Sequence, residues 1–108
     1  MSVYIIKHKE LQETNNIVYV GASVLALKQI WGKHRSDYKS YKKTGKMKRS
    51  SSMVLNKYGV ENCVCEVLEE AEWNALAERE WFHIQKHWND CVNKVRPNIS
   101  DKSVAHRL

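Results

Sequence analysis

The chain has 108 residues, of which 43% are hydrophobic and 28% charged, and its formal net charge is +6. This length suits a single domain with one modest core, and no apolar run is long enough to span a membrane. A lysine at position 7 interrupts the first apolar stretch too early for a secretion signal, so we expect a cytoplasmic, non-secreted protein. Three cysteines, an odd number, argue against a disulfide framework. Cys63 and Cys65 lack the usual zinc-site spacing and are expected to be small core residues.

Charge is concentrated in two segments of opposite sign. From Lys28 to Arg49 there are nine Lys or Arg and one Asp, which gives a local net charge of +8. From Glu61 to Glu80 there are seven Glu and one Arg, which gives −6. The first segment is suited to bind a polyanion and the second would repel it, so we expect them on different faces. The candidate phosphate contacts are Lys28, Lys33, Arg35, Lys42, Lys43, Lys46, Lys48 and Arg49.

The first half of the chain predicts two strands and a helix. Strands over 3–8 and 17–21, separated by a polar turn, are typical of an antiparallel hairpin. Ser23 follows and is expected to cap a helix over 25–43. The apolar and aromatic positions of this helix form a single stripe, which consists of Leu27, Ile30, Trp31, His34, Tyr38 and Tyr41.

The second half adds two helices, a strand and a short extended segment. A helix over 51–58 begins in a run of serines that can cap it. A strand over 63–69 carries apolar side chains on both faces, which predicts a central position in the sheet. A last helix over 72–87 is followed by a short extended piece at 91–93.

Together these elements predict an α/β protein, a three-stranded antiparallel sheet flanked by helices in the order β-β-α-α-β-α. We expect one domain over 1–96 and a polar C-terminal tail over 97–108. Within the last helix, Glu80 lies on the same stripe as Ala77 and Ile84. A carboxylate that faces a core is costly unless it is paired or holds a cation, so Glu80 predicts either a metal site or an internal salt bridge.

Several short motifs, in this order, resemble the GIY-YIG nuclease superfamily. The resemblance extends over nearly the whole chain, and small stand-alone members related to homing endonucleases and to viral or phage proteins look most similar. The motifs are Tyr4, Tyr19-Val20-Gly21, the helix segment Lys33-His34-Arg35-Ser36-Asp37-Tyr38, Glu78-Arg79-Glu80-Trp81 and the closing Cys91-Val92-Asn93-Lys94.

The resemblance implies a DNA endonuclease that hydrolyses phosphodiester bonds at a tyrosine, glutamate and divalent-metal site. Glu80 would ligate Mg²⁺ or Mn²⁺, since hard cations prefer oxygen ligands. Tyr4 or Tyr19 would orient or deprotonate the attacking water, and His34 would position a tyrosine or contact phosphate. Asn93 would tether the glutamate or fix the fold. The implied partner is DNA, with RNA as the alternative, bound by a monomer or a homodimer and without a membrane.

The sequence departs from the family pattern at one catalytic position. One turn before His34, where the family has an arginine, this chain has Ile30. An isoleucine cannot neutralise a phosphate, so either another cation takes over or catalysis is weakened or lost. Three hypotheses follow: an endonuclease, a catalytically weakened or inactive nucleic-acid-binding protein of the same fold, and a small basic structural protein without a site.

Overall fold

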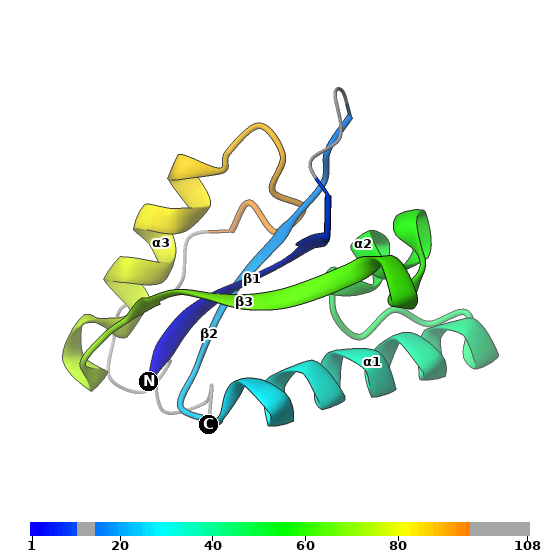
Figure 1. The fold of residues 1–108 in the computed structure, drawn as a ribbon, viewed down its shortest axis with the longest axis horizontal. Coiled ribbons are helices and arrows are strands. Elements are labelled where there is room, and N and C mark those ends of the chain that lie inside the picture. The colour runs from blue at the N-terminus through cyan, green and yellow to red at the C-terminus, as the bar shows by residue number, and fades with distance from the viewer. Residues whose placement is uncertain (11–14, 96–108) are drawn as a thin grey trace.

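A computed structural model describes residues 1–10 and 15–95, and within them the strands form one antiparallel sheet in the order β2-β1-β3 (Figure 1). β1 spans Ser2–His8, β2 spans Tyr19–Ser23 and β3 spans Cys63–Glu70. With helices packed on both faces, this is the predicted α/β architecture, which is thereby confirmed. The tail predicted over 97–108 and the boundary before it lie outside the described residues.

The central strand is β1, and the prediction that 63–69 would be central is wrong. Val3, Tyr4, Ile5 and Ile6 of β1 are all buried, as befits a strand covered on both faces. In β3 the residues that follow Cys63 are half-buried or exposed, as is typical of a strand at the edge of a sheet. The uninterrupted apolar run of β1 was therefore the better signal for the central position.

The helices follow their predicted ranges closely. α1 spans Leu27–Thr44, α2 spans Ser51–Tyr58 and α3 spans Leu76–Lys86. α3 begins later than predicted because Trp73–Ala75 form a separate 3₁₀ turn.

The predicted serine caps are not used as expected. Ala26, not Ser23, occupies the N-cap of α1, while the Ser23 hydroxyl accepts a hydrogen bond from the Leu25 N–H at 3.0 Å. Ser50 takes the N-cap of α2 without a side-chain capping bond to any described residue. The next serine, Ser51, turns its hydroxyl into the interior instead, where it contacts His34.

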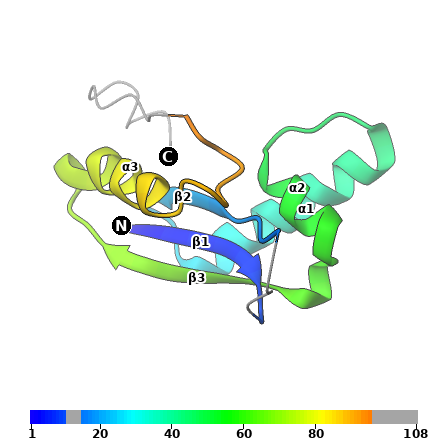
Figure 2. The ribbon, with the colours of Figure 1, turned by 90° about the horizontal axis from the view of Figure 1, so that it is seen from above.

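The two faces of the sheet carry separate hydrophobic clusters. Val3 and Ile5 pack with Leu76 and Ile84 beneath α3. Tyr4 and Ile6 point to the opposite face, as alternation along a strand requires, and join the cluster beneath α1 and α2. Figure 2 shows α3 on one side of β1 and the pair α1 and α2 on the other. No helix in the described residues is long and apolar enough to cross a membrane.

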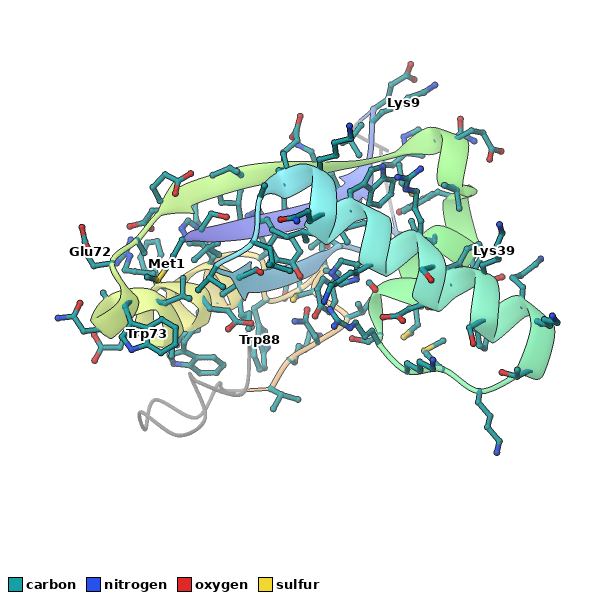
Figure 3. The ribbon with its side chains drawn as sticks, turned by 90° about the horizontal axis from the view of Figure 1, so that it is seen from below. Met1, Lys9, Lys39, Glu72, Trp73 and Trp88 are labelled. Atoms are coloured by element: carbon teal, nitrogen blue, oxygen red, sulfur yellow. The ribbon has the colours of Figure 1, made fainter. Side chains whose placement is uncertain are left out.

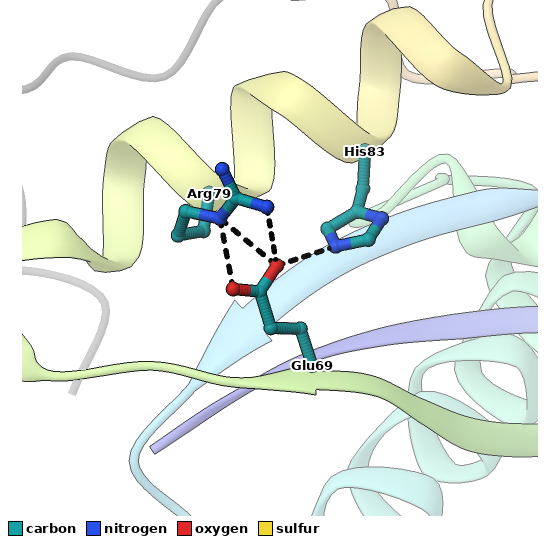
Figure 4. Close-up of polar contacts among 3 residues, drawn as sticks. All are labelled: Glu69, Arg79 and His83. Carbon is teal, nitrogen blue, oxygen red and sulfur yellow. Dashed lines mark hydrogen bonds and ion pairs between the residues drawn. The ribbon is translucent and has the colours of Figure 1, made fainter.

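A polar cluster fixes α3 against β3 (Figure 4). The carboxylate of Glu69 accepts hydrogen bonds from Arg79 Nε at 2.9 Å and forms an ion pair with Arg79 Nη2 at 2.8 Å. His83 Nε2 lies 2.8 Å from the same carboxylate. The hydrogen bond from Arg79 lowers the pKa of Glu69, and the one from His83 adds to this. With Arg79 and His83 directed to β3, the adjoining Glu80 lies on the buried side of α3.

The later part of the acidic segment lies far from the basic helix α1. Figure 3 shows Glu72, just before α3, and Lys39, on α1, at opposite ends of the molecule. Both residues are exposed. The first part of the acidic segment is nearer, since β3, which carries Glu66, packs against α1, so the two segments are separated only in part.

Candidate active site

The two strand tyrosines meet over a glycine. Tyr4 of β1 lies directly opposite Gly21 of β2, and Tyr19 lies two residues before Gly21 on the same strand face. A Cβ at Gly21 would stand 2.5 Å from the Tyr4 hydroxyl oxygen and 3.0 Å from Cε1 of Tyr19. Because real contacts are never this short, Gly21 provides the space in which both rings lie, with their centroids 6.3 Å apart.

Gly21→Ala is therefore expected to disturb both tyrosines. The added methyl must displace the buried Tyr4 ring, which we expect to lower the free energy of unfolding by about 1–3 kcal/mol. Thermal unfolding monitored by near-UV circular dichroism measures the change in stability, and the folded-state spectrum reports the change in the tyrosine environments. Gly32→Ala is the matched control, since a Cβ at that helical glycine meets nothing within 4 Å. If Gly21→Ala were as stable as this control, the close packing over Gly21 would be contradicted.

His34 of α1 connects the tyrosines to α2. Its side chain is completely buried, with Nε2 2.7 Å from the Tyr4 hydroxyl and Nδ1 2.7 Å from the Ser51 hydroxyl. Its ring centroid lies 5.1 Å from that of Tyr19. Burial, with a contribution from the charge of Arg49, lowers the pKa of His34 to about 3, so the ring is neutral at pH 7. His34 is thus hydrogen-bonded to Tyr4 in the interior and has no exposed surface.

Ser51 is the member of this cluster that sequence reasoning missed. Its hydroxyl completes a hydrogen-bonded chain that runs from Tyr4 through His34 to α2. In the sequence it is one of three consecutive serines at a helix start, where a capping role is the ordinary expectation. No local pattern distinguishes it, because its partner is 17 residues away.

Glu80 is buried on α3, which packs against β1, the strand that carries Tyr4. Burial raises the pKa of Tyr4 well above its ordinary value, the neighbouring Tyr19 raises it further, and Glu80 contributes in the same direction. The Glu80 side chain is 4% exposed, although it belongs to α3 on the other face of the sheet from His34. The structure therefore brings Tyr4, Tyr19 and His34 into contact with one another, whereas Glu80 is buried on α3, on the other face of the sheet.

Asn93 binds the backbone of β2 beside this region. Its Oδ1 accepts a hydrogen bond from the Val20 N–H at 3.1 Å, and its Nδ2 donates to the Val20 carbonyl. Oδ1 also accepts from the Cys91 thiol at 2.9 Å. Because Val20 lies between Tyr19 and Gly21, these bonds attach Asn93 to the strand that carries both residues.

The predicted phosphate contacts form an exposed basic surface on α1 and the loop after it. Every one of them is solvent-exposed. Arg35 stacks over the Trp31 ring at 5.6 Å, and Lys42 lies over the Tyr38 ring at 6.0 Å. By contrast, Ile30 is 3% exposed and packs in the cluster that contains Tyr4. The position expected to hold a catalytic arginine is thus part of the core.

A family model, the GIY-YIG catalytic domain, matches residues 1–94. The chain belongs to the GIY-YIG family. No curated protein and no solved structure gives a significant match. GIY-YIG proteins are a family of nucleases, so membership makes nucleic acid the substrate class of this domain. It agrees with the resemblance drawn from the sequence motifs.

GIY-YIG nucleases typically use divalent metals, which raises the question of whether these residues could hold one. Within residues 1–10 and 15–95 there is no group of three or more His, Cys, Asp or Glu that could bind a metal by itself. Mg²⁺, however, is usually held by one or two carboxylates together with water and substrate phosphates. A single buried carboxylate, Glu80, fits that mode of binding.

Proposed function

We propose that this chain is a metal-dependent DNA endonuclease that hydrolyses phosphodiester bonds at Tyr4, Tyr19, His34, Glu80 and Asn93. The observation that carries the proposal is the buried hydrogen-bonded chain from Tyr4 through His34 to Ser51, together with the buried Glu80 on α3, which packs against the strand that carries Tyr4. A site-free structural protein would have no need to bury a histidine, a tyrosine hydroxyl and a carboxylate in one small domain, since each is costly to desolvate.

The two tyrosines have different surroundings, which supports different roles. Tyr4 is 2% exposed and its hydroxyl is bonded to His34, so it orients groups in the site. Tyr19 is half-buried and can meet the attacking water at the surface of the site, where it would orient or deprotonate it. His34 is neutral, so when its Nδ1–H donates a hydrogen bond to Ser51, Nε2 accepts one from the Tyr4 hydroxyl, and both lone pairs of the Tyr4 oxygen stay available.

Glu80 would hold Mg²⁺ or Mn²⁺. When bound, the cation would neutralise charge on the phosphoryl group and lower the pKa of a water. The basic surface formed by α1 and the following loop would bind the DNA backbone, which predicts affinity that falls steeply with salt. A monomer would nick one strand, whereas a homodimer would cut both.

A second candidate function is supported by one specific observation. Ile30 is buried where the family's arginine is expected, so the same fold could bind nucleic acid with weak or no cleavage. Loss of one charge-stabilising group commonly costs about 100-fold to 1,000-fold in rate. Cleavage and binding must therefore be measured separately.

Metal removal distinguishes the two candidates. We expect the protein to convert supercoiled plasmid to nicked or linear product in Mg²⁺ or Mn²⁺. Cleavage should stop when EDTA is in excess. In the same EDTA buffer a gel-shift assay should still show DNA binding, because the basic surface does not depend on the metal. A shifted complex without product in either metal would support the second candidate, and cleavage that persists in EDTA would contradict metal dependence.

A further inference from the structure

The candidate site needs a cation that its own helix does not provide. Negative charge on a phosphoryl group must be neutralised during hydrolysis, and arginine suits this because its planar fork can donate two parallel hydrogen bonds. In α1 the corresponding position is the buried, apolar Ile30. A replacement must therefore reach the site from another element.

Arg49 is held against α1 at the level of His34. Its Nε lies 3.0 Å from Oδ2 of Asp37, which is three residues after His34 and therefore on the same face, almost one helical turn away. This contact engages Nε, so the two terminal amino groups of the guanidinium remain able to bind a phosphate. The Arg49 side chain is 44% exposed, so a substrate can reach it.

A second contact fixes the backbone near Arg49. Ser51, two residues further along the chain, bonds to Nδ1 of His34 at 2.7 Å, and His34 in turn bonds to the Tyr4 hydroxyl at 2.7 Å. The segment that carries Arg49 is thus attached to the tyrosine–histidine cluster as well as to Asp37. Two anchors on α1 leave the arginine little freedom to move away from the site.

The charge of Arg49 affects the pKa values of His34 and Tyr4. It lowers the pKa of His34 and, against the dominant effect of burial, that of Tyr4. This agrees with the position of Arg49, which is anchored at Asp37 on the helix that carries His34.

We propose that Arg49, held in place by Asp37, contacts the scissile phosphate and supplies the cationic group that Ile30 cannot. The assignment rests on the proposed nuclease function and deepens it. Arg49 would act as a catalytic residue and not only as one of many contacts to the DNA backbone. The arginine that contacts the phosphate would thus come from the loop before α2 and not from α1.

The test compares single-turnover cleavage of supercoiled plasmid by wild type, Arg49→Ala, Arg49→Lys and Lys48→Ala in Mg²⁺, over a range of protein concentrations. We expect Arg49→Ala to lower the maximal rate by about 100-fold or more, with a smaller loss for Arg49→Lys, which keeps the charge but not the fork. Lys48→Ala removes the neighbouring charge and should weaken DNA binding with little change in maximal rate. Asp37→Asn should lower the maximal rate by less than Arg49→Ala.

Thermal unfolding of each variant shows whether it is folded, so a loss of rate in a stable protein supports the proposal. If Arg49→Ala changes only DNA affinity, as Lys48→Ala does, or keeps the wild-type rate, Arg49 is not catalytic and the nuclease function stands. If wild type itself does not cleave, both the proposed function and this inference are wrong.

Discussion

Replacing Glu80 with glutamine is expected to abolish DNA cleavage and to leave the fold intact. Glutamine keeps the shape of the side chain but loses the negative charge, which is what a divalent cation requires of a ligand. We expect the cleavage rate to fall by about 100-fold or more. Stability should be unchanged or higher, because a charge that is 4% exposed is costly to bury.

The same substitution should leave DNA binding nearly unaffected, since Glu80 is buried whereas the basic residues of α1 and the loop after it are exposed. Cleavage rate, gel-shift affinity and thermal unfolding are measured on one preparation. Glu78→Gln is the matched control: it removes an equal charge from an exposed position two residues earlier on α3, and should cleave like wild type. Equal rates for the two variants would contradict the role proposed for Glu80.

Replacing His34 with alanine is expected to be the most destabilising single change at the site. The imidazole is completely buried and bonds to both Tyr4 and Ser51, so its removal leaves a cavity and two hydroxyls without their partner. Large-to-small changes of this kind, with buried polar groups left unsatisfied, cost about 3 kcal/mol or more. Urea unfolding gives the difference, and Lys33→Ala, on the exposed side of the same helix, should stay within about 0.5 kcal/mol of wild type.

His34 also predicts how stability depends on pH. The unfolded chain takes up a proton at this histidine below about pH 6.5, whereas the folded protein resists protonation until about pH 3. Stability is therefore complete above pH 6.5 and declines as the pH falls through this window, by up to about 1.4 kcal/mol per pH unit.

Urea unfolding at pH 7.5, 6.0 and 5.0 measures this slope. His87 also has a pKa that is lowered, first by burial, so His87→Gln is used to remove its contribution. A His87→Gln protein whose stability does not change between pH 7.5 and 5.0 would contradict a neutral, buried His34.

The fold could be predicted largely from local patterns. Apolar periodicity and turn residues located the strands and helices, and the order of elements then limited the sheet to a few arrangements. The position of β1 in the centre was missed, although Val3 to Ile6 form an uninterrupted apolar run, because side chains on both faces of β3 suggested the same for that strand. How deeply β1 and β3 are each buried depends on where the helices pack, and the sequence of one strand does not contain that information.

Some residues of the candidate site could likewise be predicted from the sequence, and others could not. Tyr4, Tyr19, His34 and Glu80 could be proposed because motif spacing and an acidic residue on an apolar stripe mark them in the sequence. Ser51 and the placement of Arg49 could not, since each depends on how the loop after α1 folds back along that helix. A serine in a serine run and an arginine in a basic loop look ordinary until tertiary contacts select them.

The account is tested most directly by the time course of supercoiled plasmid loss with wild type and Glu80→Gln, at equal protein concentration in Mg²⁺. Nicked or linear product from wild type alone is the predicted result, and it would establish a working GIY-YIG nuclease that depends on this carboxylate. Product from both proteins would contradict the proposed centre. No product from either, with DNA still shifted in a gel, would mean that the fold serves binding rather than cleavage.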